Sequence, residues 1–129
     1  MAVQKLPFGA TGGRPVDKYI LTCGALEAEI ITFGAAVAAL RVPDQAGRPV
    51  DVVLGYRTLA GYERNGGYLG ALVGRYANRI AGASCLIDGE RVALEPSEGT
   101  KQLHGGVKGF SYRVFAGEIT GDSQVTLTY

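Results

Sequence analysis

The stretch Ser84-Cys85-Leu86-Ile87-Asp88-Gly89-Glu90-Arg91-Val92-Ala93-Leu94 places two short apolar runs on either side of an Asp-Gly pair. An Asp-Gly pair between two strand-like runs is typical of a type I′ turn, because both central residues of that turn need a positive φ. The stretch therefore predicts a β-hairpin whose strands are residues 84–87 and 91–94. The same arrangement, a run of Val, Ile, Leu and Tyr that ends at a glycine-containing turn, recurs along the chain.

The chain contains 20 glycines among 129 residues, about twice the average usage. Glycines between short apolar runs indicate many turns between strands. Two further turns are expected at Pro43-Asp44-Gln45-Ala46-Gly47 and Thr120-Gly121-Asp122-Ser123, and only residues 58–64 have helical character. The other expected strands are residues 19–22, 25–32, 36–42, 50–54, 113–119 and 124–129. These patterns predict an all-β fold, a single domain of residues 1–129 built as one antiparallel β-sandwich.

Composition and charge limit the classes of partner. Hydrophobic residues make up 47% of the chain, enough for one core, and the net charge is +1 with 13 basic and 12 acidic residues interspersed. This balance gives no basic surface for nucleic acid or for an anionic membrane, so we expect neutral small molecules or proteins as partners. The first six residues hold no apolar run. We therefore expect neither a signal peptide nor a transmembrane helix, and a cytoplasmic location.

Cysteine and histidine are scarce. Cys23 and Cys85 lie apart in apolar, strand-like surroundings, which favours two buried free thiols over a disulfide. One histidine and two distant cysteines do not have the spacing of zinc ligands, so no metal site is expected.

Two glycine-flanked segments gather the side chains most suited to ligand binding, Gly74-Arg75-Tyr76-Ala77-Asn78-Arg79-Ile80 and Leu103-His104-Gly105-Gly106. Arginine offers a rigid fork of donors, whereas asparagine and neutral histidine both donate and accept. A sugar needs this mixture, because each of its hydroxyls is donor and acceptor at once. The glycines beside His104 would also allow a ligand to approach the backbone closely.

The two segments resemble the corresponding segments of the aldose 1-epimerase (galactose mutarotase) family, and the interval from Arg79 to His104 fits the family's spacing. Further similar segments occur in the expected order: Phe8-Gly9, Phe33-Gly34-Ala35, Val42-Pro43-Asp44 with Gly47, Asp51-Val52-Val53-Leu54-Gly55, Tyr62 and Gly70. The resemblance implies the family's large twisted β-sandwich, the galactose mutarotase-like supersandwich. It also implies interconversion of the α and β anomers of free aldoses such as glucose or galactose, without a cofactor or metal.

The resemblance implies that Asn78, Arg79 and His104 bind the sugar, with His104 supporting catalysis. The family's general acid, a second histidine, and its general base, a glutamate, would lie beyond position 129. We therefore expect the chain to be an inactive N-terminal portion of such an enzyme. Residues 124–129 would then form a strand with an exposed edge, through which the chain could associate with itself.

Several alternatives stay open on the sequence alone. Arg75 is expected to be structural, and Tyr68, Tyr76 and Phe110 could stack on a sugar but are more often core residues. Glu95 and Glu98 could form the carboxylate pair of a glycosidase, but neither is expected to be buried. The protein could also be a sugar-binding or regulatory module without catalysis, or an epimerase-like protein for hexose 6-phosphates.

Overall fold

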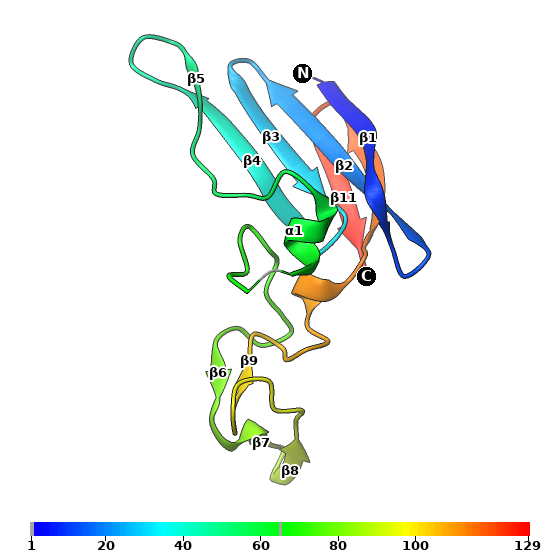
Figure 1. Cartoon of the computed structure of the whole chain (residues 1–129), viewed down its shortest axis with the longest axis vertical. Coiled ribbons are helices and arrows are strands. Elements are labelled where there is room, and N and C mark those ends of the chain that lie inside the picture. Colours follow the sequence, from blue (N-terminus) through cyan, green and yellow to red (C-terminus); the bar gives the residue numbers. More distant parts are fainter. Residues whose placement is uncertain (1, 65) are drawn as a thin grey trace.

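The computed structural model describes residues 2–64 and 66–129, and its largest element is a five-stranded antiparallel sheet (Figure 1). Consecutive strands are neighbours, so the sheet is a meander in which each turn joins adjacent strands. Its strands are β1 (Ala2–Thr11), β2 (Arg14–Cys23), β3 (Leu26–Ile31), β4 (Ala36–Pro43) and β5 (Pro49–Asp51). The sequence patterns predicted β2 to β5 and the antiparallel all-β class, and the structure confirms both.

Strand β1 was not predicted, because Pro7 and Gly9 interrupt its apolar pattern. Pro7 fits in the observed strand because β1 is an edge strand, where a missing N–H is tolerated, and Gly9 fits because glycine adopts its φ of +148° without strain. The pairing of β1 with β2 shifts between Pro7 and Gly9, which marks a bulge. The sheet thus accommodates the two residues that obscured the strand.

The remaining elements are short. They are α1 (Leu59–Glu63), β6 (Arg79–Ile80), β7 (Ser84–Ile87), β8 (Glu90–Ala93), β9 (Gln102–Leu103), β10 (Ala116–Gly121) and β11 (Gln124–Thr128), with 3₁₀ turns at Ala81–Ala83 and Phe110–Tyr112. The predicted hairpin turn joins β7 to β8, and its residues Asp88 and Gly89 have φ values of 51° and 84°. The positive signs confirm the turn geometry that the Asp-Gly pair predicted.

The core lies where α1 packs against the sheet. Its buried residues are Val16, Ile31, Phe33, Ala36, Leu59 and Tyr62. Tyr62 is 1% exposed, and its Oη accepts a hydrogen bond of 3.1 Å from the backbone N of Tyr56. Burial raises the pKa of the Tyr62 phenol, since the charged form would lose its hydration. This short helix therefore closes one end of the core.

The β10–β11 hairpin forms a second layer against the sheet and passes behind it in Figure 1. The Tyr19 Oη donates a hydrogen bond of 2.8 Å to the carbonyl of Gly117 in β10. Two backbone hydrogen bonds connect the segment before β10 to the segment after β3. Phe115 N donates to Thr32 O at 2.9 Å, and Gly34 N donates to Arg113 O at 2.7 Å. The predicted strand 113–119 therefore begins only at Ala116, because its first residues bridge to the sheet instead.

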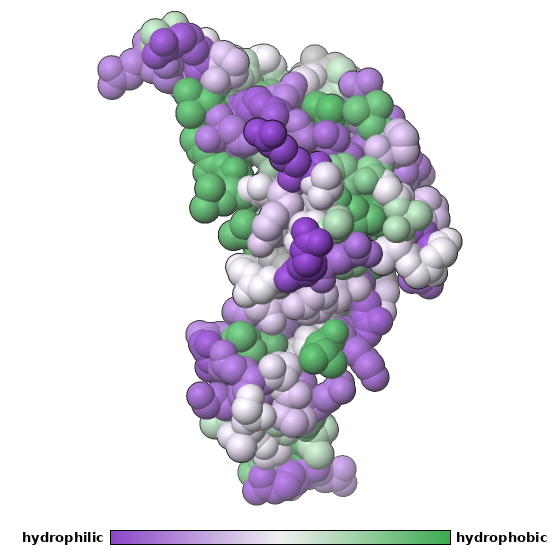
Figure 2. All heavy atoms as spheres, in the orientation of Figure 1, coloured by the Kyte–Doolittle hydropathy of each residue, from purple (hydrophilic) through white to green (hydrophobic). Residues whose placement is uncertain are grey.

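Strands β6 to β9, residues 79–103, form a distal lobe beyond the lower end of the sheet (Figure 1). Figure 2 shows apolar atoms along the left flank of the upper half of the molecule, and Val50, Val52 and Leu54, in β5 and the segment after it, are exposed. In the described residues no helix is long and apolar enough to cross a bilayer.

The cysteines are free, as predicted, but the expectation that both are buried is wrong. Cys23 is exposed and Cys85 is only partly buried. Cys23 is the last residue of β2, so it lies at the rim of the sheet rather than in its covered centre.

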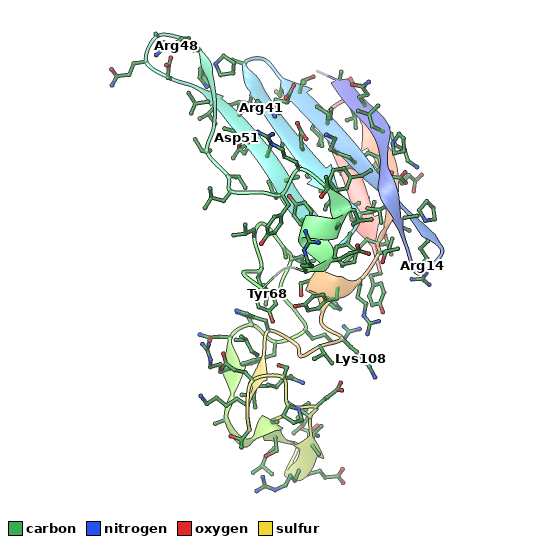
Figure 3. The ribbon with its side chains drawn as sticks, viewed as in Figure 1. Arg14, Arg41, Arg48, Asp51, Tyr68 and Lys108 are labelled. Carbon is green, nitrogen blue, oxygen red and sulfur yellow. The ribbon has the colours of Figure 1, made fainter. Side chains whose placement is uncertain are left out.

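A charged network crosses β2, β3 and β4. Glu29 Oε2 lies 2.8 Å from Lys18 Nζ, and its Oε1 lies 2.8 Å from the Arg41 guanidinium (Arg41 is labelled in Figure 3). Burial by itself raises the pKa of Glu29, but the hydrogen bonds from Lys18 and Arg41 outweigh it, and the pKa is lowered from its ordinary value of 4.5.

We expect the Glu29 carboxylate to stabilise the fold at neutral pH and to lose this effect in acid. A lowered folded-state pKa means that the contribution is complete above the unfolded value and disappears as the pH falls through the folded value. Glu29→Gln should therefore melt below the wild type at pH 7, and the difference should shrink below about pH 4.5. Thermal melts by circular dichroism between pH 3 and 7 measure this, with Glu90→Gln in β8 as control. A melting difference independent of pH would contradict it.

Candidate functional site

The pairing of β6 with β9 brings the two glycine-flanked segments together. Arg79 lies opposite Leu103 and Ile80 opposite Gln102 in an antiparallel ladder. Asn78 comes just before β6 and His104 just after β9, so the ladder places them at the same end. The structure thus unites the three residues that the sequence assigned to sugar binding, although they come from segments about 25 positions apart.

Asn78 and His104 are joined by two reciprocal hydrogen bonds. The backbone N of His104 donates to the carbonyl of Asn78 at 3.0 Å, and the backbone N of Asn78 donates to His104 Nδ1 at 2.9 Å. Because Nδ1 accepts a hydrogen bond, the proton of the neutral imidazole lies on Nε2. His104 therefore offers its Nε2–H as a donor.

Asn78 and His104 also share an uncommon backbone conformation. Their φ values are 65° and 52°, in the left-handed region where asparagine and histidine are enriched among the non-glycine residues. The reciprocal bonds hold both residues in this conformation, so backbone and imidazole orient each other.

Arg79 faces a carboxylate that the sequence did not predict as its partner. Its Nε lies 2.5 Å from Glu98 Oε2 and its Nη2 2.8 Å from Glu98 Oε1, which is a bidentate pair. Its Nη1 lies 3.4 Å from the Asn78 Oδ1. The hydrogen bonds between Arg79 and Glu98 raise the pKa of Arg79 and lower that of Glu98. Glu98 thus joins the predicted sugar-binding residues through Arg79.

An aromatic ring supports the imidazole. The ring of Tyr68 lies edge-on to that of His104, with centroids 4.8 Å apart, and Tyr112 lies 6.2 Å from Tyr68. Burial raises the pKa of the Tyr68 phenol, and its hydrogen bond with Tyr112 adds to the effect. Figure 3 shows Tyr68 where the sheet meets the distal lobe. Of the three predicted stacking candidates, Tyr68 is the one that contacts a predicted site residue.

The other two aromatic candidates line a hollow beside the site. Tyr76 is 61% exposed. Phe110 packs against Phe115 and Tyr129, and the Arg75 guanidinium lies over its ring at 5.2 Å from the centroid. This stacking is a packing contact and agrees with a structural role for Arg75.

Gly105 allows the two segments to touch. A Cβ at this position would lie 1.9 Å from the carbonyl oxygen of Gly74, and the φ of Gly105 is +84°. The sequence predicted that the glycines beside His104 would let a ligand approach the backbone. In the structure the close approach is instead to the chain's own segment 74–80.

A hollow of about 560 Å³ lies beside the site, and none of the three predicted sugar-binding residues lines it. Its walls include Arg75, Ile80, Leu94, Lys108, Phe110, Arg113 and Tyr129. Asn78 and Arg79 are exposed and His104 is partly exposed, so the three form an open wall outside this hollow. Within residues 2–64 and 66–129 no group of His, Cys, Asp or Glu side chains is arranged to hold a metal ion.

The wall presents hydrogen-bonding groups in one small area. They are an imidazole Nε2–H, the outer edge of a guanidinium and a carboxamide. Such groups can bind several hydroxyls of a sugar and orient it.

Comparison with known proteins finds one matching family. Residues 17–129 match the family described as Aldose 1-epimerase. The galactose mutarotase of Bos taurus is 46% identical over 112 residues, covering 85% of this chain and 33% of that protein. The aldose 1-epimerase of Escherichia coli K12 is 36% identical over 124 residues, covering 95% of this chain and 36% of that protein.

Solved structures show the same similarity. A GalM/aldose epimerase homologue from C. elegans superposes with a TM-score of 0.74 at 35% identity, over 79% of this chain and 31% of that one. The galactose 1-epimerase of Lactobacillus acidophilus NCFM superposes with a TM-score of 0.81 over 98% of this chain and 38% of that one. Because its sequence identity is 20%, this similarity supports the fold alone. The chain spans about a third of the length of the relatives it matches.

Proposed function

The chain belongs to the aldose 1-epimerase family, and we propose that Asn78, Arg79 and His104 form the sugar-binding wall of an enzyme that interconverts the α and β anomers of free aldoses. The observation that supports this most is the pair of reciprocal hydrogen bonds between Asn78 and His104. It fixes both residues, and with them Arg79, on one surface with their donors available.

The proposed reaction is mutarotation. A base removes the proton of the C1 hydroxyl while an acid protonates the ring oxygen; the ring opens, the C1–C2 bond rotates, and closure reverses both transfers. Arg79 and Asn78 would hold sugar hydroxyls, and the Nε2–H of His104 would donate to a sugar oxygen. In this proposal these three residues orient the sugar, and the resemblance assigns the two proton transfers to other groups, a second histidine and a glutamate.

The hexose 6-phosphate alternative requires cationic side chains that converge on a phosphate. Arg75 and Arg113 both line the hollow, but their guanidiniums lie over the rings of Phe110 and Tyr129. Arg113 Nε also donates to the carbonyl of Lys108 at 2.9 Å. These contacts engage both arginines within the protein, which favours an unphosphorylated sugar. Self-association and a cytoplasmic location stay predictions.

We expect the chain to bind galactose weakly and the variants Arg79→Ala and His104→Ala to bind it at least about tenfold more weakly, because each loses a donor to the sugar. Titration followed by two-dimensional ¹H–¹⁵N NMR measures this. Arg91→Ala, which removes another exposed arginine, is the matched control, and Arg75→Ala should affect folding yield more than affinity. Equal affinities for Arg79→Ala and Arg91→Ala would contradict the assignment.

Polarimetry with fresh α-galactose complements the titration. The chain itself should not accelerate mutarotation above the buffer rate, because it supplies positioning groups only. A rate that scales with protein concentration would contradict this and show that a group of this chain transfers protons.

A further inference from the structure

The Glu98 carboxylate occupies one defined edge of the Arg79 guanidinium. Its two oxygens receive Nε–H and one Nη2–H, the two parallel donors of that edge. A planar fork held at two points cannot rotate about its stem. Glu98 therefore fixes the plane in which the other donors of Arg79 lie.

The opposite edge of the fork stays available to a ligand. Arginine has five N–H donors; Glu98 takes two of them, and Nη1 lies 3.4 Å from the Asn78 Oδ1. Within the described part of the chain, the remaining donors point away from the ion pair. A sugar hydroxyl can thus bind Arg79 without displacing Glu98.

Glu98 is held by its own loop. The backbone N of Glu98 donates to the carbonyl of Lys101 at 3.0 Å, and the backbone N of Lys101 donates back to Glu98 at 3.0 Å. Ser97 Oγ accepts a hydrogen bond of 2.9 Å from the backbone N of Leu103, the last residue of β9. The loop is therefore tied to the strand that leads into His104.

We propose that Glu98 is the positioning residue of Arg79: it aims the guanidinium at the sugar and neutralises its charge, so that the wall prefers neutral aldoses to anionic sugars. This inference rests on the proposed sugar-binding function. A neutral pair gains nothing from a carboxylate on the ligand, whereas an unpaired guanidinium would attract one.

The test compares the affinities for galactose and for galacturonate, its C6 carboxylate analogue, in the 129-residue chain. Wild type should prefer galactose. Glu98→Gln should bind galactose about threefold or more weakly and shift the affinity ratio toward galacturonate by about three- to tenfold, less so in 0.5 M salt. Glu95→Gln, in the same loop and with the same change of charge, should leave both affinities unchanged. The Arg79 Nε–H resonance of the free protein should move in Glu98→Gln and not in Glu95→Gln.

The outcomes separate the inference from the proposed function. If wild type binds no sugar, the proposed function fails, and the inference with it. If wild type binds galactose but Glu98→Gln binds it equally or more tightly, Glu98 does not position Arg79 and the inference alone is wrong. If the NMR spectrum of Glu98→Gln shows that this variant does not fold, Glu98→Asp provides the test instead. Aspartate keeps the negative charge but is too short for the bidentate pair with Arg79. Glu98→Asp should therefore bind galactose more weakly than the wild type and still prefer galactose to galacturonate.

Discussion

Gly105→Ala should disrupt the site more than any side-chain removal within it. The added Cβ would lie 1.9 Å from the carbonyl oxygen of Gly74 and 2.7 Å from its carbon. Both are backbone atoms, and the same carbonyl accepts a hydrogen bond of 3.1 Å from Phe110 N, so it cannot turn aside cheaply. We expect a loss of about 3 kcal/mol or more in the free energy of unfolding and loss of galactose binding, because the two segments must separate.

The control for this variant is Gly82→Ala. Gly82 also has a positive φ, +63°, but nothing lies within 4 Å of a Cβ there. Its substitution should cost about 1–2 kcal/mol from the left-handed backbone alone. Urea denaturation of both variants measures the difference. Equal losses would mean that backbone conformation, and not contact between segments 74–80 and 103–106, explains the effect.

Ile31→Ala should have the second large effect, on the sheet. Ile31 is fully buried in the core cluster with Val16, Phe33 and Tyr62. Removing three carbon atoms from a packed core typically destabilises by about 2–5 kcal/mol, a large share of the roughly 5–15 kcal/mol of a small domain. Ile31→Val should cost only about 0.5–1.5 kcal/mol.

The control for the core prediction is Ile119→Ala. Ile119 is 46% exposed on β10, so its loss should change the free energy of unfolding by less than about 0.5 kcal/mol. If the urea midpoint of a variant shifts while the dependence of the unfolding free energy on urea concentration keeps its slope, the substitution has changed stability alone. Similar losses at Ile31 and Ile119 would show that the sheet core is not where the stability lies.

The sequence predicted the parts of the fold that local chemistry determines. The Asp88-Gly89 turn specifies its hairpin through two positive φ values, and the structure shows both. Strand β1 escaped prediction because an edge strand tolerates Pro7, a property that no local pattern reveals. Strands β6 and β9 are two residues each and exist only because they pair with each other. Their pairing is a tertiary event.

The candidate site, too, has parts that the sequence predicted and parts that depend on tertiary contacts. The resemblance singled out Asn78, Arg79 and His104, and their grouping in space follows from the β6–β9 ladder; their roles stay predictions. The contact between Arg79 and Glu98 could not be read from the sequence, since it depends on how the loop before β9 folds back. The prediction that Cys23 is buried was wrong because the apolar pattern around it does not show that the covered part of the strand ends before Cys23.

The hydrogen bond from Asn78 N to His104 Nδ1 also restricts the part that His104 could take in the proton transfers of the proposed reaction. With Nδ1 committed as an acceptor, release of the Nε2 proton would leave an imidazolate anion, and uptake of a second proton would set two donors against each other. In the proposed reaction we therefore expect His104 to remain a donor that keeps its hydrogen, while other groups carry the protons between the C1 hydroxyl and the ring oxygen.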